Sequence, residues 1–147
     1  MDQVQVAILE IPMPNLSTTG SPGKMTRAAG YVLSALPVLM MLMSGTMKLV
    51  QPPMVVEGFA KSGIVPSTIS AIGIVELLCV VVYLIPRTAV LGAILVTGYL
   101  GGAVYVHVQK GEPAMLAPLL LGMCAWGGLY LRDARVRALI PLRAPAE

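Results

Sequence analysis

A single acidic residue stands in the middle of a long apolar stretch of this chain. Residues 71–84 read AIGIVELLCVVVYL, and Glu76 is the only charged side chain among them. A carboxylate at the centre of a bilayer costs about 2.5–3.5 kcal/mol or more, so we expect it to be paired or protonated. Ionisable residues in membranes are by default binding groups or proton carriers. The alternative interpretation of Glu76 is a structural carboxylic acid that joins two helices.

Two more polar side chains lie near the ends of apolar stretches. Lys48 lies near the end of residues 30–50, and His107 lies near the end of residues 88–108. Both side chains can donate hydrogen bonds, and a carboxylate can accept a proton. Lys48 could equally extend to lipid headgroups, and His107 could be an interfacial or helix-packing residue. One histidine cannot build the usual zinc site, so we expect no metal.

The composition and the apolar segments indicate a membrane protein. Of the 147 residues 56% are hydrophobic and 12% are charged, whereas soluble domains carry about 25% charged residues. The apolar segments cover approximately residues 30–50, 64–85, 88–108 and 115–131. Each can cross a hydrocarbon core of about 30 Å as a helix. Because lipid offers backbone groups no hydrogen bonds, the sequence predicts an all-α integral membrane four-helix bundle.

The remaining segments give the expected organisation. Residues 1–27 form a predicted flexible N-terminal tail, residues 28–131 the transmembrane domain, and residues 132–147 a basic cytoplasmic tail. Residues 54–61 have an apolar and a charged side, which predicts a short interfacial helix between helices one and two. The side of both termini holds Lys24, Arg27, Arg87, Arg132, Arg135, Arg137 and Arg143, and the other side holds Lys48, Lys61 and Lys110. The positive-inside rule therefore predicts both termini in the cytoplasm. The basic residues form no cluster typical of nucleic-acid binding.

This topology places the polar residues at defined depths. Glu76 lies about 12 residues, or about 18 Å, into its helix and therefore near the bilayer midplane. Lys48 and His107 share a level nearer the outer surface. We therefore predict an outward-opening polar pocket with Lys48 and His107 at its mouth, Ser44 and Tyr99 below, and Glu76 at its floor. These five residues are the candidates for ligand binding or proton relay, and no catalytic residue is assigned.

Other residues are interpreted as packing groups. Gly98 and Gly102 form a GxxxG step, which predicts close helix contact. The same role is predicted for Gly101, Ala103, Gly122, Gly127 and Gly128. Pro37 predicts a kink in the first helix. Cys79 and Cys124 are predicted to pack in the bundle, and no spacing supports the alternative of a redox pair.

Four segments together resemble the DoxX-like family of small four-helix integral membrane proteins. They are SGTMKL at 44–49, SGIVP at 62–66, GIVELLCVVVYLIPRT at 73–88 and LGAILVTGYLGGAVYVHV at 91–108. The resemblance covers about residues 30–131 and leaves out the N-terminal tail. It implies a multi-pass protein of the bacterial cytoplasmic (inner) membrane. The family's namesake is a small subunit of a quinone-linked oxidoreductase connected with thiosulfate oxidation, and a eukaryotic relative is a receptor-assembly chaperone.

Three functions are consistent with the sequence. The first is a non-catalytic or accessory subunit of a quinone-linked redox system, which binds a quinone and needs a redox-enzyme subunit as partner. It would need that partner because the chain lacks the four cysteines of an iron–sulfur site and a haem ligand set, and no covalently bound cofactor is expected. The second is an assembly or interaction protein, which contacts another membrane protein. The third is a small proton-coupled transporter, a class with one intramembrane Glu that works as homo-oligomers. Whether the chain is an enzyme is left open.

Overall fold

The computed structural model describes residues 23–139 and is helical throughout the part that could cross a membrane. The long helices are α2 (Lys24–Val50), α4 (Ile69–Leu84), α5 (Ala89–Gln109) and α6 (Leu116–Arg132). Short 3₁₀ turns, Pro66–Thr68 and Pro113–Met115, precede α4 and α6. With these turns, the four segments have 27, 19, 21 and 20 residues, and all are long and apolar enough to span a bilayer. The predicted all-α membrane bundle is confirmed.

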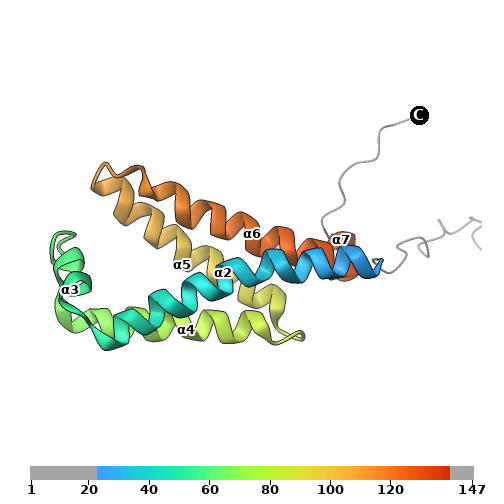
Figure 1. The fold of residues 1–147 in the computed structure, drawn as a ribbon, viewed down its shortest axis with the longest axis horizontal. Coiled ribbons are helices and arrows are strands. Elements are labelled where there is room, and N and C mark those ends of the chain that lie inside the picture. The colour runs from blue at the N-terminus through green and yellow to red at the C-terminus, as the bar shows by residue number, and fades with distance from the viewer. Residues whose placement is uncertain (1–22, 140–147) are drawn as a thin grey trace, which may run out of the picture.

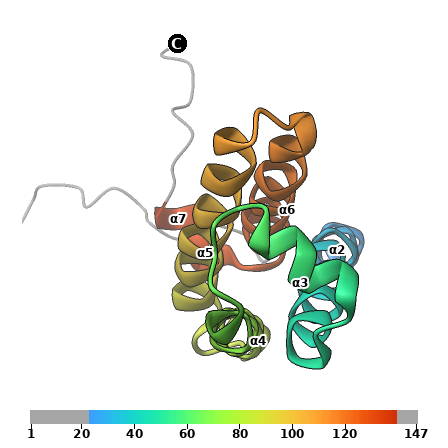
Figure 2. The same ribbon diagram turned by 90° about the vertical axis from the view of Figure 1, so that its left-hand side faces the viewer.

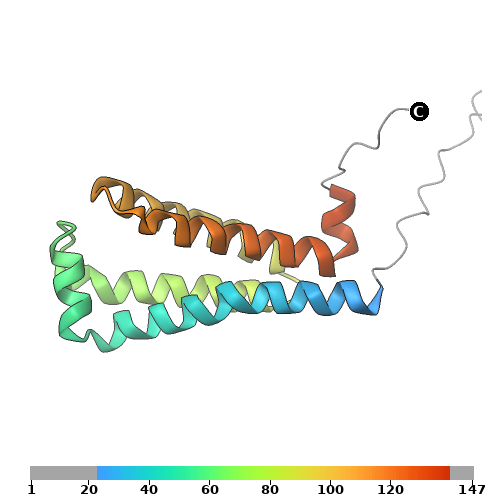
Figure 3. The same ribbon diagram turned by 45° about the horizontal axis from the view of Figure 1, so that its top comes forward.

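The four long helices pack in a ring. Helix α2 contacts α4 and α6, and α5 contacts the same two helices. The ribbon shows α2 and α4 as one layer and α5 and α6 as a second layer, which spread apart toward one end (Figures 1 and 3). Helix α3 (Pro53–Ala60) lies across that end (Figure 2), and this confirms the predicted short helix between helices one and two. We call it the α3 end, and the opposite end, beside α7 (Ala134–Leu139), the α7 end.

The apolar core is densest toward the α7 end. Tyr83, Val80 and Leu129 are each 1% exposed, and Val136 of α7 joins them at 1%. Many other leucine and valine side chains of the long helices point outward and are exposed. Such exposure is expected for helices that face lipid tails instead of water. The packed layer at the α7 end holds the helices together while the layers separate toward α3.

Glycines allow the closest helix contacts. A side chain on Gly128 of α6 would begin 2.3 Å from the Ser34 hydroxyl and 2.8 Å from the Gly30 carbonyl oxygen of α2. A side chain on Gly73 of α4 would begin 3.0 Å from the Gly45 carbonyl oxygen of α2. Small residues let membrane helices approach closely. These two crossings therefore fix α2 against both of its neighbours.

The predicted packing role of the GxxxG step on α5 is wrong within this chain. Nothing lies within 4 Å of a side-chain carbon added at Gly98, Gly101 or Gly102. Close contact on α5 instead occurs at Gly92, where an added carbon would lie 2.3 Å from the Tyr83 backbone. Gly92 follows the tight α4–α5 connection, whereas the GxxxG step lies where the two layers have begun to separate.

The helix ends differ from the predictions outside the apolar segments. Helix α2 begins at Lys24 instead of residue 30, and the predicted basic tail contains α7. Helix α7 docks because Val136 is buried in the core. Helix α2 continues through Pro37, and its ribbon is bent in the middle (Figure 1), as the proline predicts. Residues 1–22 and 140–147 lie outside the described residues, and the orientation of the termini stays a prediction.

Candidate functional site

An ion pair between Lys48 of α2 and Glu76 of α4 forms the centre of the site. Lys48 Nζ lies 2.8 Å from Glu76 Oε2, and the side chains are only 12% and 3% exposed. The same ammonium donates to the Ser44 hydroxyl. The Ser44 hydroxyl itself lies 3.4 Å from Glu76 Oε2. Glu76 therefore has the partner that a carboxylate among apolar helices requires.

The close crossing of α2 and α4 makes this pair possible. A side chain on Gly73 would begin 2.8 Å from the Lys48 side-chain carbon Cβ, so only glycine leaves room for the lysine stem. Gly45 of α2 similarly faces Leu77 and Glu76 of α4. Ser44 precedes Lys48 by one helical turn and therefore lies on the same face. Two glycines thus bring the three polar side chains together.

A cavity of about 780 Å³ adjoins the ion pair toward the α3 end. All four long helices and α3 contribute to its lining. The lining contains all five residues that the sequence nominated, which are Ser44, Lys48, Glu76, Tyr99 and His107. The walls are otherwise mostly apolar and include Met40, Met41, Met43, Met47, Ile72, Leu100 and Leu121. A polar group in an apolar cavity of this size is typical of a small-molecule site.

Gly98 and Gly102 take a different role from the predicted one. Both line the cavity, and neither has an atom of another element near its missing side chain. Because both lack side chains, the α5 wall stays open at this level. The GxxxG step therefore leaves space for the cavity in this chain.

Helix α3 covers the cavity at its end. The Lys48 ammonium lies 5.9 Å from the centre of the Phe59 ring, within cation–π range. Lys110, in the connection between α5 and α6, donates to the Gly58 carbonyl oxygen at 3.3 Å. Phe59, Gly58 and Lys110 all line the cavity. None of these three residues was predicted from the sequence to line the site, although the charge of Lys110 in a short connection was the available signal.

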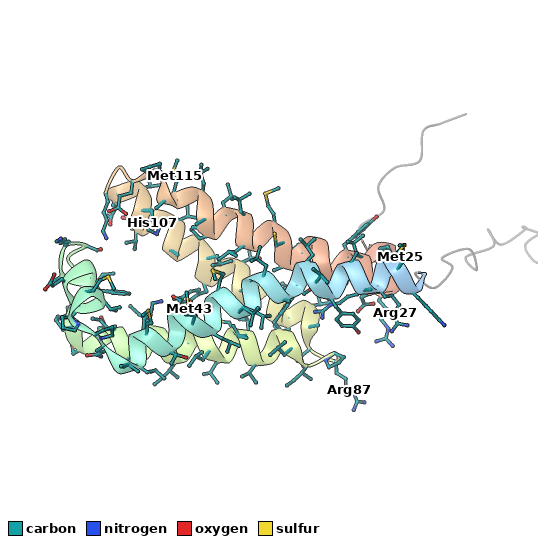
Figure 4. The ribbon with its side chains drawn as sticks, in the orientation of Figure 1. Met25, Arg27, Met43, Arg87, His107 and Met115 are labelled. Atoms are coloured by element: carbon teal, nitrogen blue, oxygen red, sulfur yellow. The ribbon has the colours of Figure 1, made fainter. Side chains whose placement is uncertain are left out.

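Lys48 and His107 do not form the predicted joint mouth of the pocket. Lys48 reaches inward to Glu76 because its flexible stem can follow the apolar wall. His107 stays at the α3 end (Figure 4), where its Nδ1 atom lies 2.9 Å from Glu112 Oε2. Its side chain is 31% exposed. The structure thus brings Lys48, Glu76 and Ser44 together and places His107 elsewhere on the same lining.

Tyr99 of α5 faces the Lys48–Glu76 pair across the site. It is half-buried in the cavity lining and lies within electrostatic range of Glu76. Its hydroxyl is close enough to share a hydrogen bond with the Glu76 carboxylate. Tyr99 can therefore donate either to Glu76 or to a ligand oxygen in the cavity.

Of the two cysteines, Cys79 lies one turn after Glu76 on α4, within electrostatic range of Glu76 and Tyr99. Cys79 is buried in the core and Cys124 is half-buried, and both are free thiols. Within the described part of the chain, no three His, Cys, Asp or Glu side chains gather in a way that could hold a metal ion. The chemistry of the site therefore rests on the ion pair, the phenol of Tyr99 and the cavity beside them.

The fold and the site define a small multi-pass membrane protein with a polar cavity between its helices. The model of the DoxX-like family matches residues 32–128, which are 97 of the 147 residues. The chain therefore belongs to the DoxX-like family, and the resemblance in its motifs is confirmed. The match includes all five nominated residues. No curated protein and no solved structure matched the chain.

Proposed function

We propose that this chain is a non-catalytic, accessory subunit of a quinone-linked redox system in the bacterial cytoplasmic membrane. Its cavity would bind the head of a quinone or of a chemically similar lipid-like molecule. The observation that carries the proposal is the buried Lys48–Glu76 pair in the wall of a cavity of about 780 Å³. A buried ion pair is seldom more stabilising than apolar packing of the same volume. Its position beside a cavity therefore supports a role in binding or proton transfer.

The cavity has the chemistry that a quinone head requires. Its volume lies within the ~300–1,000 Å³ range of small-molecule sites, and its methionine and leucine walls suit an isoprenoid chain. Tyr99 and Lys48 carry hydrogen-bond donors for a carbonyl oxygen. A bound quinone supplies two-electron redox chemistry coupled to proton uptake and release. The donors, the carboxylate and the apolar walls together fit such a group.

The ion pair offers a way to hold and move a proton. Glu76 can accept a proton at its carboxylate, and protonation would remove the negative charge that holds Lys48. The Lys48 ammonium would then be free to donate to a ligand oxygen. The chain has two cysteines, fewer than the four that usually hold an iron–sulfur cluster. Electron transfer is therefore assigned to a partner subunit.

A second candidate is an assembly or interaction protein. The observation that favours it is the hydrogen bonding of Lys48, whose ammonium contacts Glu76, the Ser44 hydroxyl and the Ser44 carbonyl oxygen. For such a protein, the Lys48–Glu76 pair only holds α2 against α4. The cavity would then bind no ligand, and substitution of Tyr99 would not change the binding of any molecule.

Equilibrium binding of short-chain quinones to the purified protein tests the proposal. Decylubiquinone and a short-chain menaquinone would be compared for wild type, Glu76→Gln and Tyr99→Phe. Glu57→Gln and Tyr105→Phe are matched controls, because both side chains are exposed and lie outside the cavity lining. A quinone oxygen only accepts hydrogen bonds, and Glu76→Gln frees the Lys48 ammonium to donate to it, so this variant should bind quinone up to roughly tenfold more tightly. Tyr99→Phe loses a donor and should bind quinone more weakly than wild type, and the controls should bind as wild type does.

The same experiment can reject the quinone proposal. Binding that does not saturate, or that is equal in all five proteins, would contradict a specific site in the cavity. Unchanged recovery of a co-purifying partner with Glu76→Gln would then favour the assembly function. Proton release on addition of a transported substrate to vesicles would instead favour a proton-coupled transporter.

A further inference from the structure

A second polar cluster lies at the α7 end, far from the cavity. The guanidinium of Arg132, at the end of α6, lies 5.1 Å from the centre of the Tyr83 ring and 5.4 Å from that of Tyr31. Arginine stacked on aromatic rings is held in place while its in-plane N–H groups stay free to donate. Tyr83 is itself fixed, because its hydroxyl donates to the Ala125 carbonyl oxygen at 2.8 Å. Arg132 is therefore a positioned donor group.

Arg132 forms no ion pair within residues 23–139. The two ion pairs within residues 23–139 are Lys48–Glu76 and His107–Glu112, both toward the α3 end. The one acidic residue described at the α7 end is Asp133, whose carboxylate accepts the backbone N–H of Arg135 at 2.8 Å. The described basic residues of this end are Lys24, Arg27, Arg87, Arg132, Arg135 and Arg137, and Figure 4 shows Arg27 and Arg87 there. The α7 end is thus strongly positive.

Arg137 of α7 adds an independent observation. Its Nη2 atom is buried and has no hydrogen-bond partner among the described residues. The neighbouring Val136 is 1% exposed in the core, which fixes α7 and the position of Arg137. A buried donor without an acceptor is unfavourable and rare, most of all when it is charged. The arrangement calls for an acceptor of negative charge.

We infer that the α7 end binds the phosphate group of an anionic phospholipid through Arg132 and Arg137. A guanidinium matches two phosphate oxygens with parallel hydrogen bonds. Basic groups where transmembrane helices end are suited to acidic lipid headgroups. The adjacent face of α2 offers exposed apolar side chains for acyl chains, with Met25 at 87% and Val32 at 74% exposure. This inference is independent of any ligand in the cavity.

Native mass spectrometry of the detergent-purified full chain tests the inference. Phosphatidylglycerol and the zwitterionic phosphatidylcholine would be titrated against wild type and the double variant Arg132→Gln/Arg137→Gln. Arg135→Gln is a control for the loss of one positive charge, because Arg135 is exposed on the same short helix. Wild type and the control should retain phosphatidylglycerol in preference to phosphatidylcholine. Loss of the guanidinium–phosphate bonds predicts about tenfold weaker phosphatidylglycerol binding by the double variant.

Two further measurements complete the experiment. One separates the geometry of the Arg132 guanidinium from its charge, and the other separates a lipid phosphate from free phosphate. Arg132→Lys keeps the charge and supports folding but lacks the planar fork, so it should bind the lipid more weakly than wild type. Inorganic phosphate at the molar concentration of the lipid should leave the lipid-bound species in place. The inference would be overturned if Arg135→Gln lost as much phosphatidylglycerol binding as the double variant, or if Arg132→Lys bound this lipid as wild type does. It would also be overturned if the protein retained both lipids equally, or if inorganic phosphate displaced the bound lipid.

Discussion

Lys48 and Glu76 approach to 2.8 Å between two helices whose surroundings are otherwise apolar. The contact depends on glycine, because a side chain on Gly73 would occupy the space of the Lys48 stem. In a low-dielectric interior each charge is costly alone and is compensated only by its partner. The pair therefore joins α2 to α4 and places two ionisable side chains in the cavity lining.

Removing one member of the pair should destabilise the protein more than removing both. Lys48→Met leaves the Glu76 carboxylate without its counter-charge, and Glu76→Gln leaves the Lys48 ammonium without its counter-charge. Each single variant should lose about 3–5 kcal/mol of unfolding free energy, as for other broken buried pairs. The double variant Lys48→Met/Glu76→Gln leaves no uncompensated charge and should lose less than either single variant. Denaturant unfolding in detergent, followed by circular dichroism, measures this cycle.

Helix α3 offers matched controls for that cycle. Glu57→Gln and Lys61→Met make the same chemical changes at exposed positions. Each should change the unfolding free energy by no more than about 0.5 kcal/mol. Additive losses for Lys48→Met and Glu76→Gln would show that the two side chains are not energetically coupled.

The closest helix crossing should be sensitive to a single methyl group. Gly128→Ala would place a carbon 2.3 Å from the Ser34 hydroxyl and 2.8 Å from the Gly30 carbonyl oxygen. Forced separation of α2 and α6 should cost about 1–3 kcal/mol, the usual range for overpacking. Gly101→Ala meets no atom within 4 Å and should be neutral or up to about 1 kcal/mol more stable, since alanine favours helix. Thermal unfolding of both variants checks the contrast, and equal effects would contradict the described crossing.

The sequence predicted the helices best where they cross hydrocarbon. The ends at Val50, Leu84 and Gln109 lie within about two residues of the predictions, which is the usual uncertainty of helix ends. The start of α2 at Lys24 and the whole of α7 were missed. Both lie in polar, basic sequence, where long apolar runs no longer indicate the structure. Only the burial of Val136 shows why α7 is ordered on the bundle.

The sequence predicted which residues line the site, but it predicted only some of the contacts between them. Topology and depth placed Ser44, Lys48, Glu76, Tyr99 and His107 on one side of the bundle, and all of them line the cavity. The sequence left open whether the Lys48 stem would turn toward headgroups or toward Glu76, because lysine is flexible enough for both. Small-residue spacing indicated Gly98 and Gly102 but could not distinguish a helix contact from a cavity wall.

The bond between Lys110 and α3 should limit access to the cavity. Lys110→Met removes the bond to the Gly58 carbonyl oxygen, so α3 should move away from the α5–α6 connection more often. Ala103→Cys in a Cys79→Ala/Cys124→Ala background places a thiol in the cavity lining. Its alkylation by a water-soluble maleimide should become roughly threefold to tenfold faster, as expected for one partly exposed charged hydrogen bond.

The control for this effect is Lys61→Met, which removes an exposed lysine beside α3. It should leave the alkylation rate unchanged. If Lys110→Met also leaves the rate unchanged, helix α3 is either held by other contacts or is no barrier to the cavity.

The Tyr83 hydroxyl should contribute to stability separately from its ring. Tyr83→Phe removes the donor to the Ala125 carbonyl oxygen and the partner of the Ser34 hydroxyl, which lies 2.9 Å away in the core. The unpaired Ser34 group should raise the total cost to about 1–3 kcal/mol of unfolding free energy. Tyr105→Phe, at a side chain 61% exposed, should stay within about 0.5 kcal/mol of wild type.

The same variant separates folding from lipid binding at the α7 end. Tyr83→Phe keeps the aromatic face over which the Arg132 guanidinium lies, so phosphatidylglycerol retention by the folded protein should equal that of wild type. Tyr83→Leu removes the ring as well and should weaken retention, because Arg132 loses one of its two aromatic contacts. Native mass spectrometry below the unfolding temperature of both variants gives the comparison. Equal retention by Tyr83→Leu would show that the ring does not position Arg132.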